Sequence, residues 1–273
     1  MLNYQNANTY KNSNLFFVVF FYSIIGWIYD TSVRSVPARR YINGGFLNGP
    51  YCPIYGFGGI LVIWLLNGVN NWWQLFILGS VLTCTLEYIT SWLMEKLFKA
   101  RWWDYSHNSF NINGRICLLG AIAFGSLSVL LIKIIHPIIM GWTSMIPNSW
   151  IFYTATIIFL TLIIDFVLTI RSFDQLKKNL SNLEKSIFLN LNGKKFLLKN
   201  WKKFLKSNIW SQSFKKILKE NKIYERYIEP FSKHLSIQQK RLLNAFPDIK
   251  LKNRSGLLEE IRKIRFIKHK NNK

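Results

Sequence analysis

Three acidic residues interrupt stretches of sequence that are otherwise apolar, and they are the first candidates for chemistry. Glu87, Asp30 and Asp165 stand within or at the ends of runs rich in Leu, Ile, Phe and Val. A charged side chain near the centre of a bilayer costs roughly 3 kcal/mol on insertion scales, so it persists mainly where it has a partner or a task. Such a carboxyl group can line a polar path for a solute or serve as an acid or base.

Glu87 is the strongest of the three candidates. Helical spacing puts a polar stripe on or beside its face, made of Ser80, Thr83, Cys84, Thr90 and Ser91. Asp30 has Arg34 one turn later, so an interfacial Asp–Arg pair explains it without a function. Asp165 ranks below Glu87, because no polar stripe accompanies it; its sequence favours pairing with another helix or a position near the inner headgroups.

The elements that must position these acids are membrane-spanning helices. A window of about 20 residues, the length that crosses a hydrocarbon core, finds five candidate spans, with Trp and Tyr near several ends. The spans are 15–33, 53–69, 72–94, 116–135 and 150–170. We therefore expect an all-α polytopic membrane protein with about five transmembrane helices; the short, glycine-bearing second span is the doubtful one.

Basic residues alternate between the connections of these spans. Arg34, Arg39 and Arg40 follow the first span, Lys96, Lys99, Arg101 and Arg115 follow the third, and neither the second nor the fourth is followed by a basic loop. Since basic loops stay in the cytoplasm, we expect a multi-pass protein of the cell membrane with its N-terminus outside and its C-terminal tail cytoplasmic.

The composition divides the chain at Ile170. From Arg171 onward lie 27 of the 36 Lys and Arg residues against eight acids, a net charge of +19. We predict a transmembrane domain over 1–170 and a basic cytoplasmic amphipathic-helical tail over 171–273. Leu176, Leu180, Leu183 and Ile187 recur at helical spacing, and 194–220 interleaves Lys with Phe, Leu, Trp and Ile.

The expected partners of the tail follow from its charge. A basic amphipathic helix beside a membrane most often lies on the anionic lipids of the inner leaflet. Nucleic acid is the less favoured partner, because the sequence lacks the spacings of zinc fingers, basic zippers and RNA-binding aromatics. The segment 235–249 predicts a further short helix stopped by Pro247, a possible docking element for a soluble partner.

Known cofactor and catalytic motifs are missing from the sequence. The stretch 44–59, GGFLNGPYCPIYGFGG, has no Lys followed by Ser or Thr and is not a phosphate-binding loop. Cys52, Cys84 and Cys117 are expected to be buried thiols, and no His pairs with a second ligand at metal spacing. We expect no cofactor, no metal, no catalytic residue and no intrinsic catalytic activity.

Two segments are dense in turn-forming and aromatic residues. In the first, Pro53 suits the first turn of a helix, and Gly56, Gly58 and Gly59 let another helix backbone come close. In the second, 99–120, Asn113-Gly114 signals a turn. Its aromatic residues Trp102, Trp103, Tyr105 and Phe110 are expected in the headgroup layer, with polar neighbours that can read carboxylates or phosphates.

Three motifs in order carry a resemblance to a known family. GFLNGPYCPIYGFGG, LEYITSWLME and RWWDYS…FNINGRICLLGAIAFG together resemble the CmpB family of bacterial membrane proteins, the ABC-transporter type IV permeases, over roughly residues 23–124. Asp30 stands where we expect that family to favour Glu, and QQKRLLNAFPDIK is similar to the family's tail.

The resemblance implies one shared site formed by both loops and the intramembrane acids, at an inner vestibule beside Glu87. Its residues would be Asp30, Asn43, Gly45, Phe46, Gly49, Pro50, Pro53, Tyr55, Gly56, Glu87, Trp103, Asp104, Tyr105, Asn113, Gly114 and Arg115.

Three classes of function stay open. The first is a transport permease subunit of unknown substrate, which needs an ATPase on a separate chain and, with few spans, a homo-oligomer to make a pathway. The second is a membrane-embedded scaffold that binds lipid or protein and reads the inner leaflet with its tail. The third is an intramembrane enzyme that uses Glu87 or Asp104 as acid or base.

Overall fold

A computed structural model describes residues 2–190, 224–251, 257, 258 and 261 of the 273-residue chain, and nearly all of the regular structure is helical. The helices are α1 Leu2–Ala38, α2 Pro53–Leu66, α3 Trp72–Phe98, α4 Leu118–Leu130, η1 Leu131–Ile135, α5 His136–Ser144, α6 Asn148–Asn190, η2 Tyr224–Ile228, α9 Glu229–His234 and α10 Ile237–Ala245. Within the described residues the strands are β1, Ala100–Arg101, and β2, Lys250–Leu251, which pair antiparallel.

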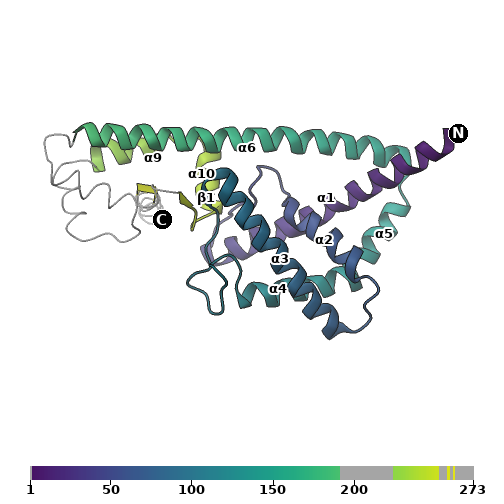
Figure 1. Cartoon of the computed structure of the whole chain (residues 1–273). Coiled ribbons are helices and arrows are strands. Elements are labelled where there is room, and N and C mark those ends of the chain that lie inside the picture. Colours follow the sequence, from purple (N-terminus) through teal and green to yellow (C-terminus); the bar gives the residue numbers. More distant parts are fainter. Residues whose placement is uncertain (1, 191–223, 252–256, 259–260, 262–273) are drawn as a thin grey trace. The chain divides into compact units, whose positions relative to one another are not determined.

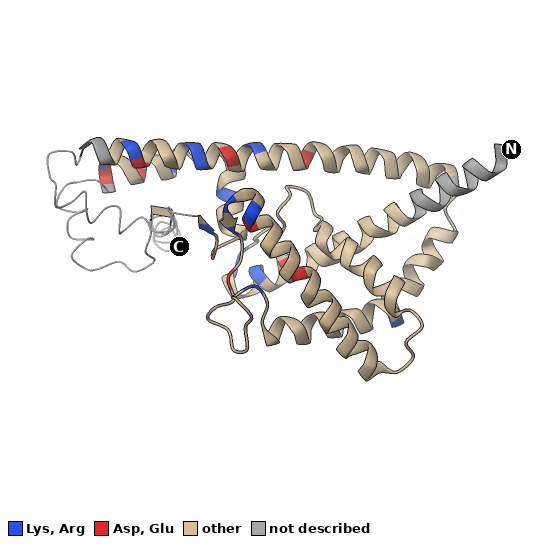
Figure 2. Ribbon diagram, viewed as in Figure 1, with Lys and Arg blue, Asp and Glu red and all other residues tan. Residues whose placement is uncertain are grey.

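Four helices are long and apolar enough to cross a membrane. They are Leu15–Ala38, Trp72–Phe98, Leu118–Ser144 and Ser149–Ile187, and the apolar α2, Pro53–Leu66, is shorter. Large apolar side chains such as Trp64, Leu119 and Ile157 lie exposed on these helices, as expected where lipid takes the place of a protein core. Figure 2 shows few charged residues along α1 to α5. The predicted class, an all-α polytopic membrane protein, is confirmed.

The chain divides into two compact units. The first comprises residues 1–93 and 103–169, and the second comprises 94–102 and 170–273. The segment 94–102, which the hydropathy pattern places with the membrane helices, thus belongs to the same unit as the tail. Its strand β1 explains this, because Ala100 pairs with Leu251 across 151 positions of sequence.

In the first unit, α2 packs closely along α1 (Figure 1). A Cβ atom on Gly56 would lie 2.5 Å from the carbonyl oxygen of Val19 and 2.3 Å from the hydroxyl of Ser23. The expectation that a glycine here admits a neighbouring helix backbone is met. Pro53 occupies the first turn of α2, where its missing N–H leaves no bond unmade.

Two small clusters contribute to the apolar core of the described part of the first unit. Val62, Leu66, Leu75 and Ile132 join α2, α3 and η1, whereas Val18, Tyr22 and Ile139 join α1 and α5. The helix from Leu118 to Ser144 is continuous and changes to the wider π form over Leu131–Ile135. Pro137, which lacks an N–H, follows directly and explains why the regular bonding is interrupted there.

The second unit has a core of its own on the C-terminal part of α6. The predicted stripe is confirmed, because Leu176, Leu180, Leu183 and Ile187 are all buried. Trp102 is also buried and packs against Phe173 and Phe246 at 4.7 and 5.1 Å between ring centroids. Its expected place in the headgroup layer is therefore wrong, since the second unit takes this ring into its core.

The predicted short helix before Pro247 is present as α10. Ser236 and Gln239 form a capping box at its start, and it ends at Ala245. Leu242 and Leu243 are buried, and the Gln239 amide donates to the carbonyl of Ser172 at 3.4 Å. The buried leucines of α10 are thus packed within their own unit, and its role as a docking element stays a prediction. The basic segment 194–220 lies outside the described residues.

Candidate functional site

The loop 43–52 is fastened to Asp165, a residue that the sequence analysis ranked low. The backbone N–H groups of Asn48 and Gly49 donate to its carboxylate at 3.0 and 2.9 Å. The side chains of Asn48, Tyr51 and Thr169 add three more bonds of 2.8, 2.7 and 3.2 Å. Asp165 therefore receives five hydrogen bonds, four from the loop and one from Thr169 on its own helix, where the sequence favoured another helix or a position near the inner headgroups.

The phenol of Tyr51 is held in its donating form. Burial raises the pKa of Tyr51, and the hydrogen bond and negative charge of Asp165 raise it further. The hydroxyl thus stays protonated and completes the set of donors around the carboxylate. We refer to Asp165 with Asn48, Gly49, Tyr51 and Thr169 as the Asp165 latch.

The other side of the loop lies on α1. Asn43 accepts from the Trp27 indole N–H at 2.8 Å and donates to the carbonyl of Asn48 at 2.9 Å. The N–H of Gly44 donates to the Thr31 hydroxyl at 3.2 Å. A Cβ on Gly44 would stand 2.8 Å from the backbone carbon of Asp30, so only glycine fits.

Asp30 is bonded from the start of α2. The Tyr55 hydroxyl donates to one carboxylate oxygen at 2.7 Å, and the Cys52 thiol lies 3.9 Å from the other. These donors come from another helix, in addition to the Arg34 charge available one turn later on α1. Asp30, Pro53 and Tyr55 of the predicted site are thus neighbours at the α1–α2 contact.

Glu87 lies in the middle of α3 and is almost fully buried, with 7% of its surface exposed. The Tyr105 hydroxyl donates to its Oε1 at 3.2 Å. Its Oε2 is buried and has no hydrogen-bond partner among the described residues. Cys84 and Ser91, on the predicted polar stripe, are buried on the same face.

Several nearby charges affect the pKa of the Tyr105 phenol. Burial raises the pKa of Tyr105, the negative charges of Glu87 and then Asp30 raise it further, and the Arg34 charge lowers it. The two intramembrane carboxyl groups that sequence singled out are therefore close enough to act on one hydroxyl. We refer to Glu87, Tyr105 and Asp30 as the Glu87 cluster.

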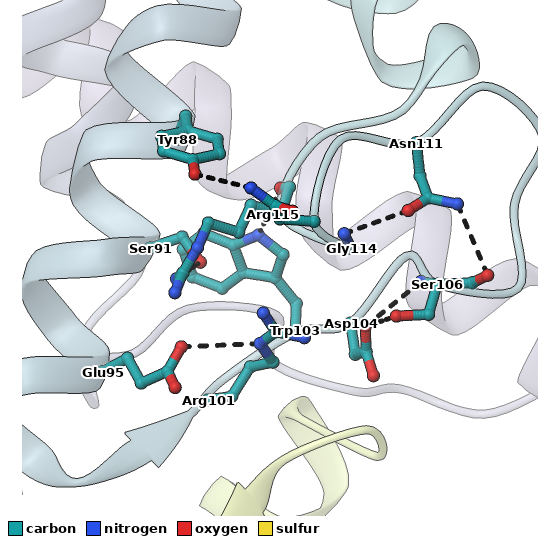
Figure 3. A network of polar contacts seen from close by, with 11 residues as sticks. Tyr88, Ser91, Glu95, Arg101, Trp103, Asp104, Ser106, Asn111, Gly114 and Arg115 are labelled. Carbon is teal, nitrogen blue, oxygen red and sulfur yellow. Dashed lines mark hydrogen bonds and ion pairs between the residues drawn. The ribbon is translucent and has the colours of Figure 1, made fainter.

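Residues 103–117 form a structured loop fastened to α3 (Figure 3). The Arg115 guanidinium donates to the Ser91 hydroxyl at 3.1 Å and stands over the Tyr88 ring, 5.6 Å from its centre. Asn113 donates to the Tyr88 hydroxyl at 2.9 Å, and the Trp103 indole donates to the Arg115 carbonyl at 3.1 Å. Three predicted site residues thus share one network.

The predicted turn at Asn113-Gly114 is confirmed. Both residues have positive φ, 52° and 64°, and Arg115 N–H donates back to the carbonyl of Ile112. That is the geometry of a tight two-residue hairpin, for which Asn-Gly is the favoured sequence. The tip of the loop carries Phe110, which is 81% exposed.

Other members of the predicted site have local roles. Asp104 is buried and accepts hydrogen bonds from the backbone and hydroxyl of Ser106. Pro50 is exposed, and Phe46 is half-buried. Arg101, in the second unit, pairs with Glu95 at 3.5 Å (Figure 3).

The site missed by the sequence analysis is the Asp165 latch. Asp165 stands out as an intramembrane charge, but no local pattern links Asn48 and Tyr51 to it. Thr169 lies one helical turn after Asp165 and was the available clue.

The described residues show how the cysteines and the potential metal ligands are placed. No group of three or more His, Cys, Asp or Glu residues is placed to hold a metal within the described residues. Cys52, Cys84 and Cys117 are buried free thiols, as predicted. The arrangement offers a buried Glu87 oxygen to a hydrogen-bond donor and fastens two loops to membrane helices.

Comparison with known proteins finds one family. A family model described as "Putative ABC-transporter type IV", ABC_trans_CmpB, matches residues 16–170. No curated protein and no solved structure matches the chain. The matched range includes all three sequence motifs, the Asp165 latch and the Glu87 cluster. The chain therefore belongs to the CmpB family of ABC-transporter type IV membrane proteins.

Proposed function

We propose that this protein is a permease subunit of an ABC-type transporter, driven by an ATPase on a separate chain. The proposal rests on the family and on one observation in particular: loops 43–52 and 103–117 are both fastened to membrane helices by buried polar groups. Rigid loops are what a membrane subunit needs if the movement of a docked partner is to reach its helices.

The docking face would be the side that bears the basic loops. Arg34, Arg39 and Arg40 border the first loop and Lys96, Lys99 and Arg101 the second, which puts both on the cytoplasmic side by the positive-inside rule. The N-terminus is then outside and the tail inside, next to anionic lipids of the cell membrane.

The tip of loop 103–117 is the part best suited to contact the ATPase. Phe110 is 81% exposed and Ile112 57%, although Trp103 and Arg115 of the same loop are fixed by hydrogen bonds. Phe110 also adopts a positive φ of 51°, which is unfavourable for a side chain of this size. A strained, exposed aromatic on a fixed loop is typical of a recognition element.

The test is purification of the tagged protein from its native membrane in mild detergent, with mass spectrometry of everything bound. We expect a stoichiometric nucleotide-binding subunit whose ATPase activity can be measured. Phe110→Ala should reduce its recovery at least tenfold, an effect of about 1.4 kcal/mol. Ile157→Ala, which alters an exposed apolar side chain on membrane helix α6, should leave recovery unchanged.

Recovery of only lipids or other membrane proteins would overturn the transporter proposal. It would favour the alternative of a membrane-embedded scaffold that binds lipid or protein. Size-exclusion chromatography of the same sample tests the expected homo-oligomer, which a small number of spans needs to enclose a pathway.

A further inference from the structure

Glu87 combines deep burial with poor hydrogen bonding. Its side chain is 7% exposed within an apolar membrane helix, its Oε1 has one donor at 3.2 Å, and its Oε2 has none among the described residues. An ionised carboxylate can accept about four hydrogen bonds. Burying a charge without such compensation costs several kcal/mol, so an ionised Glu87 would be strongly unfavourable here.

A second carboxyl group makes ionisation of Glu87 less favourable still. The negative charges of Asp30 and Glu87 both act on the Tyr105 phenol, and two carboxylates in one site resist being charged together. Asp30 has more hydrogen-bond donors to stabilise its charge, because it accepts from Tyr55 at 2.7 Å and has the Cys52 thiol at 3.9 Å.

The other charged or titratable groups around Glu87 do not supply the missing partner. They are Tyr29 and Arg34 on α1, Tyr55 on α2, Cys84 on α3, and Arg115 and Cys117 in or after loop 103–117. The Arg115 guanidinium is directed to Ser91, one turn along α3. The described surroundings therefore leave Oε2 without a donor, and a proton on the carboxyl group is the simplest compensation.

We propose that Glu87 is a proton-binding site inside the membrane, which holds a proton at neutral pH while Asp30 beside it stays ionised. In the protonated state a polar group, and not a charge, is buried at Oε2, which lowers the cost of burial. Proton uptake links the carboxyl group to Tyr105 and so to loop 103–117, whose residues 106–110 are exposed.

This inference goes beyond the proposed function. A transporter driven by a separate ATPase has no need of a proton site, so the site would add a proton dependence that ATP hydrolysis does not supply. The two proposals are independent, since the site belongs to this chain whether or not an ATPase docks.

The experiment is infrared spectroscopy of the full-length protein in liposomes, followed as a pH titration. Wild type should show the carbonyl stretching band of a neutral carboxylic acid at neutral pH, and Glu87→Gln should abolish it. Glu95→Gln is the matched control, because Glu95 lies on the same helix but is 41% exposed and paired with Arg101. Its removal should leave the band unchanged.

A second variant keeps the proposal testable if Glu87→Gln does not fold. Asp30→Asn removes the neighbouring negative charge, so the proton on Glu87 should be held less tightly and the midpoint of the band should move to lower pH, by about tenfold in proton affinity. A wild-type spectrum without the band at neutral pH, or a band that survives Glu87→Gln in a folded protein, would overturn the proposal.

Discussion

Asp165 and Glu87 are both buried acids in membrane helices, but they differ in how many hydrogen bonds they accept. Each is an acid in a membrane helix with 7% of its surface exposed. Among the described residues, Asp165 receives five hydrogen bonds, two of them from backbone N–H groups, whereas Glu87 receives one. Burial alone thus does not tell which intramembrane acid has a structural task.

The difference lies in what each acid has been given as a partner. Asp165 gathers two backbone N–H groups of the loop and three side-chain donors around one carboxylate, so it fastens the loop to α6. One carboxyl oxygen of Glu87 has no hydrogen-bond partner among the described residues. Glu87 therefore contributes little to the stability of the fold and can take up a ligand. The Asp165 latch therefore has a structural role, whereas the Glu87 cluster can bind and release a ligand.

The strongest test of this difference is to replace each acid by its amide, which removes the charge and keeps the size of the side chain. Asp165→Asn replaces an acceptor by an amide N–H₂ that faces the Asn48 and Gly49 donors, and we expect it to cost on the order of 3 kcal/mol or more. Glu87→Gln keeps the bond from Tyr105 and removes a poorly solvated charge or proton, so it should stay within about 1 kcal/mol of wild type.

Thermal unfolding in mild detergent measures both variants. A large drop in midpoint for Asp165→Asn, or a failure to recover folded protein, beside a near-normal Glu87→Gln would support the distinction. Equal losses in the two variants would contradict it.

A smaller loss of stability is expected from a change where the loop 43–52 packs on α1. Gly44→Ala would press a methyl group against the backbone of Asp30 and Thr31 at 2.8 and 2.9 Å, and should cost about 1–3 kcal/mol. It should also loosen the loop, which hydrogen exchange of the Asn48 and Gly49 amides can detect. Gly141→Ala is the control, because its added methyl meets nothing within 4 Å and should be neutral or slightly stabilising.

The smallest effects come from removing one hydroxyl at each site. Tyr51→Phe deletes a 2.7 Å bond to an ionised carboxylate that keeps four other donors, so we expect a loss of about 1–2 kcal/mol. Tyr105→Phe deletes a 3.2 Å bond to a carboxyl group that we take as neutral, and should cost less than about 1 kcal/mol. Thermal unfolding of the two variants side by side checks the order; the reverse order would indicate that Glu87 is ionised.

Much of the candidate site was accessible to sequence reasoning, and the reason is local. Glu87 stood out because a charge in an apolar run is costly wherever the helix packs. Asn113-Gly114 predicted its turn because few other pairs tolerate two positive φ angles. The stripe of Leu176, Leu180, Leu183 and Ile187 required only helical spacing.

Sequence reasoning erred where a partner lay far along the chain. Asp165 bonds to residues 114 to 117 positions away, and no local pattern reveals that Asn48 and Gly49 would turn their N–H groups toward it. Trp102 looked like an interfacial ring because its sequence neighbours are aromatic and basic, yet Phe173 and Phe246 bury it.

By itself the sequence determined the membrane class, the helices, the basic tail and the acids worth examining, because hydropathy, helical period and the cost of a buried charge act over one or two turns. Only the tertiary structure decided that Asp165 accepts five hydrogen bonds while one oxygen of Glu87 has no partner among the described residues. It also decided that 94–102 joins the tail through the pairing of Ala100 with Leu251. The physical reason is that hydrogen-bond donors are supplied by whichever segments the fold brings close, and those segments lie up to 151 positions apart.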